Sequence, residues 1–236
     1  MSTRPSRGRA VRPRRNANTR YIFIAAGVLA IIGIIAVSAL ALNQPSALEG
    51  RTPDLTPINA PTGRTADGYY FKGQESAPVV VVEYADFQCP ACAQYASRIA
   101  PSIDAQYVET GQVRMIYHEM PLRQHANAFP AAEAARCAGD QNAFWQMHDM
   151  LFLNQAQWQS LAQPAGQFAG YAAQIGLDRA AFERCMSDGT HRSAIQAAQA
   201  EADALQIPGT PTFIINGQQY DAGQIQQAID AALAGQ

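Results

Sequence analysis

A Cys-x-x-Cys motif between a strand and a helix is the feature that most limits how this chain folds. Residues 79 to 84 form a β-branched apolar run that starts after Pro78 and stops before Asp86, which predicts a buried strand. Residues 89 to about 110 carry apolar side chains at helical spacing, and residues 113 to 118 predict a second strand. Strand, helix and strand within roughly 40 residues predict a βαβ unit with parallel strands and a right-handed crossover.

The remainder of the body predicts a long helical insertion followed by a return to the sheet. Residues 126 to 206 are rich in Ala and Gln and are interrupted by Gly and Pro, which predicts four or so helices. A strand is expected at 212 to 215, a turn at Asn216-Gly217, a returning strand through about Tyr220, and a last helix from about Gly223 to Leu233. The fold class is therefore α/β, with a mixed sheet.

The N-terminal region predicts a membrane anchor. Seven Arg and no acidic residue occupy residues 1 to 20, and residues 21 to 42 form a run of 22 residues without charge. As a helix this run reaches about 33 Å, enough to cross a hydrocarbon core of about 30 Å. The positive-inside rule places residues 1 to 20 in the cytoplasm as a basic tail. Residues 43 to 66, rich in Pro, predict a linker to a body at 67 to 236, which would be extracytoplasmic.

A cleaved signal peptide is the alternative to this transmembrane anchor. Ala39-Leu40-Ala41 is a small-x-small site at the end of the apolar run. The run is longer than the apolar region of a signal peptide, which favours the uncleaved anchor. Either outcome leaves the body outside the cytoplasm, where disulfides persist.

The charge of the body argues against nucleic-acid binding. From residue 43 onward there are ten basic and nineteen acidic residues, a net charge of −9. A domain that binds nucleic acid through a basic face has the opposite balance.

Cys89 and Cys92 of the Cys-Pro-Ala-Cys motif predict a redox pair. Cys89 falls at a helix N-terminus, where free N–H groups and the helix dipole favour a thiolate. Cys89 is therefore the expected attacking sulfur and Cys92 the resolving sulfur. The competing interpretation is half of a structural zinc site, but no second Cys-x-x-Cys or His pair at zinc spacing accompanies it. We predict no metal and no cofactor.

Two segments resemble the signatures of DsbA-like proteins in the thioredoxin superfamily. They are Val-Glu-Tyr-Ala-Asp-Phe-Gln-Cys-Pro-Ala-Cys at 82 to 92 and Pro-Gly-Thr-Pro-Thr-Phe at 208 to 213. The resemblance covers about residues 68 to 236 and implies a thioredoxin fold with a helical domain inserted before the cis-proline strand. It implies that Pro211 is the cis-proline, that the Thr210 backbone pairs with extended substrate, and that Glu83 is a buried acid assisting proton transfer to Cys92.

Other residues are open to more than one interpretation. Phe87 and Phe213 flank the two signatures, so they either line an apolar groove for unfolded substrate or pack in the core. Cys137 and Cys185 are expected to form a structural disulfide, with two free thiols or a redox relay as alternatives. The four histidines show no metal spacing.

The function expected from these features is thiol–disulfide exchange on reduced or unfolded secreted proteins. Oxidation is the favoured direction, and the resemblance implies reoxidation by a quinone-linked membrane partner of the DsbB or VKOR type. A reductase or isomerase of the same fold is one rival, because Pro-Ala departs from the Pro-His of the best-known oxidant. A membrane-tethered binding or chaperone module with structural cysteines is the other.

Overall fold

The structure, a computed structural model, describes residues 58–235 of the 236-residue chain. A six-stranded mixed sheet has the order β1-β2-β4-β3-β5-β6. Its strands are β1 (Thr62–Arg64), β2 (Tyr70–Lys72), β3 (Val79–Ala85), β4 (Val113–Glu119), β5 (Thr212–Ile215) and β6 (Gln218–Tyr220). β3 pairs with β4 in parallel and with β5 antiparallel.

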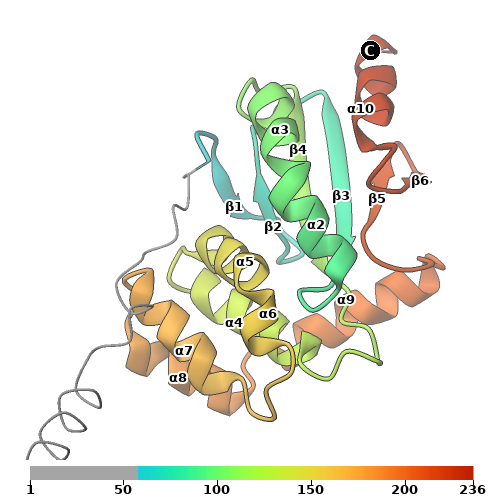
Figure 1. Ribbon diagram of the computed structural model, residues 1–236. Coiled ribbons are helices and arrows are strands. Elements are labelled where there is room, and N and C mark those ends of the chain that lie inside the picture. The colour runs from blue at the N-terminus through green and yellow to red at the C-terminus, as the bar shows by residue number, and fades with distance from the viewer. Residues whose placement is uncertain (1–57, 236) are drawn as a thin grey trace, which may run out of the picture. The chain divides into compact units, whose positions relative to one another are not determined.

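Ten helical elements accompany this sheet in the described part of the chain. They are α2 (Pro90–Arg98), α3 (Ala100–Ile103), the π-helix η1 (Asp104–Val108), α4 (Ala128–Gly139), α5 (Phe144–Leu153), α6 (Gln155–Trp158), α7 (Ala165–Gln174), α8 (Arg179–Asp188), α9 (Arg192–Ala204) and α10 (Ile225–Ala234). Figure 1 shows α4 to α8 gathered at one end of the sheet, with α9 leading back toward β5. The fold is therefore mixed α/β and thioredoxin-like, with six helices between β4 and β5.

Successive side chains of β3 point to opposite faces of the sheet, and each face has its own hydrophobic cluster. Val79 and Val81 pack with α2, α3 and α10 on one face, while Tyr84 packs with Ala202 of α9 on the other. A third cluster, built from α4, α5, α7 and α8, extends to both cysteines of the Cys-x-x-Cys motif. The motif therefore lies where the helical layer meets the sheet.

The N-terminal part of the body contains two strands that the sequence analysis did not predict. Residues 62–64, expected to belong to the linker, form β1, which pairs with β2 across a turn at Asp67-Gly68. β2 itself was not predicted. Gly63 lies opposite Phe71, and a Cβ at residue 63 would come within 2.9 Å of that ring. A glycine at this position leaves room for the Phe71 ring, but it also interrupts the alternation of apolar side chains by which a strand is recognised in a sequence.

The helix expected from 89 to 110 is broken into three pieces. Pro101 follows the end of α2, lies in the first turn of α3, and supplies no backbone N–H, so the regular helical ladder cannot continue through it. The chain continues as α3 and then as η1, which ends before Gly111 (φ +79°).

The expected anchor at 21–42 lies outside the described residues, as do the basic tail and residues 43–57 of the expected linker. Within residues 58–235 no helix has both the length and the apolar character needed to cross a membrane.

Candidate active site

Asp86 builds the turn that places Cys89 at the start of α2. Its carboxylate accepts a hydrogen bond from the Gln88 amide (2.7 Å), and its backbone carbonyl accepts one from the Cys89 amide (3.0 Å). The second carboxylate oxygen accepts from the Leu122 amide (2.9 Å) and lies 2.7 Å from His125 Nδ1. One buried carboxylate thus ties the end of β3 to the loop after β4, with Cys89 held at the N-cap of α2.

The surroundings of Cys89 favour its thiolate. A hydrogen bond from the Cys92 side chain is the largest cause that lowers the pKa of Cys89, to about 5. Burial opposes this shift, while the Thr210 side chain and the backbone N–H groups of Ala91 and Cys92 add to it. Free amides at a helix N-terminus stabilise negative charge in this way. Cys89 therefore carries a thiolate at neutral pH.

Cys92 has the opposite character. It is completely buried, and this burial is the main reason that its pKa lies well above the usual range. The neighbouring Cys89 raises the pKa further. Neither cysteine is bonded in the structure. The geometry thus distinguishes an ionised sulfur at the helix start from a protonated sulfur beneath it, as an attacking and a resolving cysteine require.

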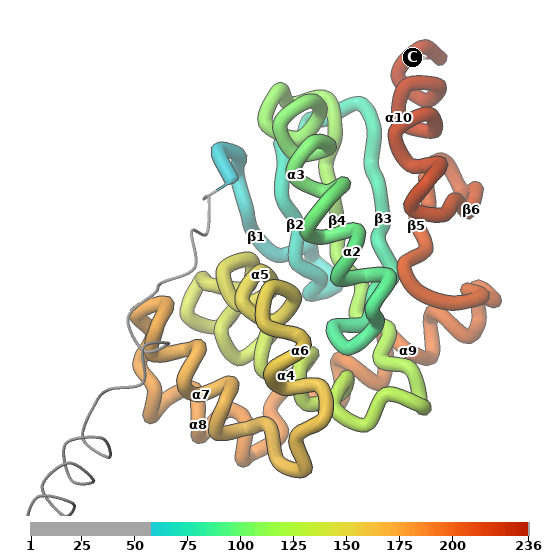
Figure 2. The backbone as a smooth tube through the Cα atoms, viewed as in Figure 1, coloured from blue at the N-terminus to red at the C-terminus, as the bar shows by residue number. Residues whose placement is uncertain are grey.

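The Thr210–Pro211 peptide bond is cis, and it lies beside the two cysteines. The Cys89 Sγ atom lies 3.3 Å from the Thr210 backbone carbonyl oxygen, across 121 positions of the chain. Figure 2 shows the turn before α2 beside the loop that joins α9 to β5. The two segments that carry the family signatures therefore form one site.

Glu83 lies in the middle of β3, only 4% exposed, and is paired across the sheet with Tyr117 of β4 and Phe213 of β5. Burial raises the pKa of Glu83 to about 8, with Lys72 lowering it and Asp104 raising it. These two neighbours form an ion pair of 2.6 Å that lines a cavity of about 350 Å³ between α2, α3 and α5. Glu83 is thus a buried acid, not a surface residue.

Tyr117 is a residue that sequence reasoning missed. Its hydroxyl is buried without a hydrogen-bond partner, and it interacts electrostatically with both Glu83 and Cys92. No hydrogen bond joins the Glu83 carboxyl to Cys92 among residues 58–235. Tyr117 therefore interacts with both groups. The only signal in the sequence was its register in the second predicted strand, opposite Glu83.

Gln155 of α6 also went unrecognised. Its amide nitrogen donates to the carbonyls of Phe87 (2.8 Å) and Cys89 (3.0 Å), which fastens the helical layer to the active-site turn. A glutamine in a Gln-rich segment gives no sequence signal of such a role.

The groove interpretation of Phe87 and Phe213 was wrong, because both rings are buried. Phe87 is 1% exposed and packs against Phe152 and Tyr117, and Phe213 is fully buried against Tyr95. Neither ring reaches a surface that substrate could touch, so core packing is the interpretation that the structure supports.

Cys137 of α4 and Cys185 of α8 form a disulfide that closes a separation of 48 residues. The alternative of two free thiols is therefore wrong. His191 lies beside this disulfide, although the spacing of the histidines in the sequence gave no hint of it. Elsewhere His118 stacks on Tyr69, and burial lowers the pKa of this imidazole to about 4.

Comparisons with known proteins agree with the geometry of the two signatures. A family model described as Thioredoxin matches residues 65–234. A Na⁺/H⁺ antiporter, NhaA 1 of Salinispora arenicola, is 35% identical over 194 residues, a match that covers 81% of this chain and 28% of the antiporter. A Rickettsia felis protein with the provisional name protein-disulfide oxidoreductase is 29% identical over 202 residues, covering 81% of this chain and 69% of that protein.

The fold is also that of a solved structure. Wolbachia pipientis α-DsbA1 is 22% identical and superimposes with a TM-score of 0.63, over 73% of this chain and 94% of the other. The chain spans less than a third of the length of the antiporter that it matches.

Proposed function

The chain belongs to the thioredoxin family, whose model covers residues 65–234, and we propose that it is a protein-disulfide oxidoreductase acting through Cys89 and Cys92. The observation that carries this proposal is the pairing of an ionised Cys89 with a protonated, buried Cys92 beside Thr210-Pro211. A pair of structural cysteines needs no such difference in pKa.

The exchange begins with the enzyme in its disulfide form. A substrate thiolate attacks the Cys89 sulfur, a bond forms between these two sulfurs, and the bond between Cys89 and Cys92 breaks. Cys92 leaves and takes up a proton, because its pKa lies well above neutral. A second substrate thiolate then attacks the substrate sulfur of the mixed disulfide and releases Cys89 as a thiolate. The substrate loses two electrons and the enzyme gains them.

Glu83 is the proposed source of the proton for Cys92. A group with a pKa of about 8 holds a proton at neutral pH and gives it up readily to a more basic sulfur. The Tyr117 hydroxyl interacts electrostatically with both groups. Lys72 and Asp104, which interact with Glu83, line a cavity of about 350 Å³.

Oxidation of substrate is the proposed direction. A low pKa makes Cys89 a good leaving group and stabilises the reduced enzyme, and a stable reduced form corresponds to a strong oxidant. The proposed substrates are reduced or unfolded secreted proteins. The proposed electron acceptor is a membrane oxidant of the DsbB or VKOR type, which would restore the Cys89–Cys92 disulfide.

The proposed location is the outer side of a membrane, with residues 21–42 as a single anchor and residues 1–20 in the cytoplasm. The sequence supports this placement through its 22 uncharged residues and its seven Arg on one side of them. The Cys137–Cys185 disulfide is consistent with an oxidising compartment.

A refolding assay tests the activity. Reduced, unfolded ribonuclease is incubated with the oxidised enzyme, and recovery of ribonuclease activity is followed over time. Cys89→Ser and Cys92→Ser each remove the disulfide that the enzyme transfers, so each should abolish the recovery. If Cys89→Ser promotes recovery as well as the parent does, the protein is a binding or chaperone module instead.

Equilibration with glutathione tests the direction. Because the Cys89 thiolate is stabilised, the reduction potential of the pair should lie well above the value of about −270 mV typical of thioredoxin. A measured potential near that value would favour a reductase.

A further inference from the structure

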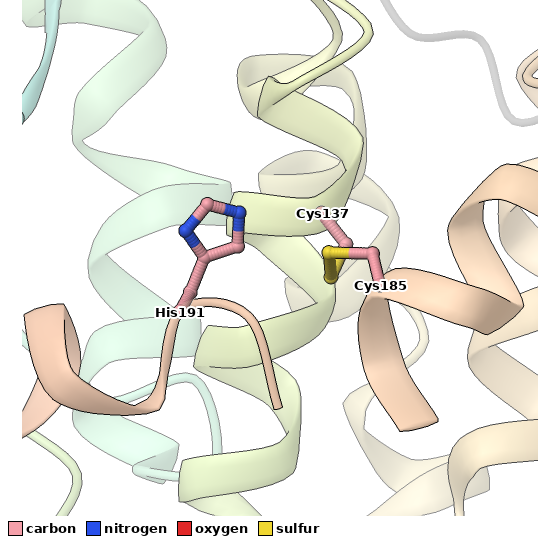
Figure 3. Close-up of side chains that lie close together, drawn as sticks. All are labelled: Cys137, Cys185 and His191. Carbon is pink, nitrogen blue, oxygen red and sulfur yellow. A yellow bond between two sulfur atoms is a disulfide. The ribbon is translucent and has the colours of Figure 1, made fainter. Parts of the chain in front are cut away.

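Three side chains of types that commonly bind metals meet in the helical layer, and two of them form the disulfide. Cys137 comes from α4, Cys185 from α8, and His191 from the residue immediately before α9. The sulfur atoms and an imidazole nitrogen all lie within 4.8 Å of one another. Figure 3 shows the His191 ring beside the two joined sulfurs. Two helices and the residue that precedes a third thus contribute to one cluster, which is separate from the Cys89–Cys92 pair.

Asp140, the residue at the C-cap of α4, is the fourth member. Its Oδ2 atom lies 2.7 Å from His191 Nε2 and 3.8 Å from Cys185 Sγ. The Asp140 oxygen is therefore close to two of the three atoms that lie within 4.8 Å of one another. With it, the cluster offers four side chains of the types that bind Zn²⁺ in tetrahedral sites.

The cluster is enclosed on most sides and open on one. Cys137 and His191 are buried and Cys185 is half-buried, whereas the Asp140 side chain is 38% exposed. An ion can reach the site from the Asp140 side. The guanidinium of Arg64, 3.7 Å from the second Asp140 oxygen, occupies the periphery and is not a ligand.

Glu133 is an independent observation that points to the same place. It lies one turn before Cys137 on α4, is 5% exposed, and has one carboxylate oxygen that is buried without a hydrogen-bond partner. Its charge interacts with His191 and Arg192. Imidazoles that bind metals commonly donate their second N–H to a carboxylate, which orients the ring. Glu133 has a free acceptor for this bond.

We propose that reduction of the Cys137–Cys185 disulfide converts this cluster into a Zn²⁺ site with Cys137, Cys185, His191 and Asp140 as ligands. A dithiol supplies the two electrons and becomes a cyclic disulfide, and the two cysteines become thiols. Zn²⁺ then binds two thiolates, one neutral imidazole and one carboxylate, and two thiol protons are released. Exchange with an external disulfide, which accepts two electrons and becomes a dithiol, reforms the Cys137–Cys185 bond and releases the ion.

The donor set selects the metal. Two thiolates and an imidazole exclude Mg²⁺ and Ca²⁺, which require oxygen ligands. Cu²⁺ would oxidise the thiolates and restore the disulfide. Zn²⁺ has no redox chemistry, so it holds α4, α8 and the start of α9 together in the chain that has lost its covalent link. This proposal does not depend on the activity of Cys89.

A cobalt titration tests the site, since Co²⁺ bound by thiolates gives an intense charge-transfer absorption. The full chain with Cys89→Ser and Cys92→Ser is used, so that only Cys137 and Cys185 remain as thiols. After reduction with dithiothreitol and anaerobic removal of the reductant, we expect one equivalent of Co²⁺ to bind and Zn²⁺ to displace it. The same protein with its disulfide intact should show no band.

Two ligand variants and one matched control test whether the folded cluster binds Co²⁺. In the reduced protein, His191→Ala and Asp140→Asn should each weaken Co²⁺ binding by about tenfold or more. Asp149→Asn removes a similarly exposed carboxylate that lies 2.8 Å from a different imidazole, that of His148, and should change nothing. Far-UV circular dichroism of each reduced sample monitors folding. Absence of the band, or a band of equal affinity in all variants, as unfolded thiols would give, overturns the proposal.

Discussion

Replacing Glu83 by Gln should raise the free energy of unfolding by an amount that grows with pH. Burial raises the pKa of Glu83 from 4.5 to about 8 in the folded protein. Below pH 4.5 the carboxyl is protonated in both states and contributes no difference. Between these two pKa values the unfolded state loses the proton while the folded state keeps it, so the parent protein becomes less stable as pH rises. The amide in Glu83→Gln has no proton to lose.

The size of the stability difference follows from the shift in the pKa of Glu83 between the unfolded and the folded state. Each unit of pKa difference corresponds to about 1.4 kcal/mol, so the full shift is worth about 5 kcal/mol. Between pH 5 and pH 8 the stability of Glu83→Gln relative to the parent should rise by about 3.5 kcal/mol. Both proteins are compared in the same redox state, which cancels the opposite contribution of Cys89, whose lowered pKa stabilises the folded protein as pH rises through about 5.

Urea unfolding at pH 5, 6, 7 and 8 measures this difference through the midpoint and the slope m. Glu75→Gln is the matched control, because that side chain is 78% exposed. A constant difference between Glu83→Gln and the parent across this range would refute the argument, since it would mean that the buried carboxyl ionises in the folded protein much as it does in the unfolded chain.

Three further outcomes are expected. In the reduced protein, alkylation of Cys89 by iodoacetamide should reach half its maximal rate near pH 5, while Cys92 should stay unmodified until the protein is unfolded; mass spectrometry of peptides distinguishes the two. The double change Cys137→Ser, Cys185→Ser should lower the free energy of unfolding in urea by about 4 kcal/mol, from the loop of 48 residues that the disulfide closes, and a loss below 1 kcal/mol would contradict the chain-entropy estimate. Arg136→Met should lower the free energy of unfolding by about 3–5 kcal/mol in the same assay, because it leaves the buried Glu119 carboxylate, 2.6 Å from the Arg136 guanidinium, without its partner. An unchanged free energy would show that the pair contributes no net stability.

Much of the fold was predictable because local patterns and tertiary structure agree. The apolar run at 79–84, the helix start at Cys89 and the Asn216-Gly217 turn each specify an element on their own, and the structure has β3, α2 and the β5–β6 hairpin in those places. β1 and β2 were missed because each has three residues and depends on a pairing partner. Such strands carry too few side chains for a periodic pattern.

The candidate site was only partly accessible from sequence. Cys89 at the N-cap of α2 and Cys92 in its first turn are three positions apart, so their chemistry follows from local context. Asp86 marked the end of a predicted strand, but its contacts to other segments were not visible, because two of its partners, Leu122 and His125, lie over 35 residues away. Phe87 illustrates the opposite error. A ring beside a motif suggests a surface role, and only packing shows that it points inward.

The position of the helices between β4 and β5 has a consequence for biogenesis. β4 is synthesised soon after β3 and can pair with it early. β5, the other neighbour of β3, is synthesised only when the ribosome reaches residues 212–215. Thr210, which contacts Cys89, arrives with it. A nascent chain that has emerged only as far as α9 therefore exposes an unpaired edge of β3 and a thiol without its cis-proline neighbour. The Cys89 site is therefore assembled near the end of synthesis, after Cys137 and Cys185 have both become available to form their own disulfide.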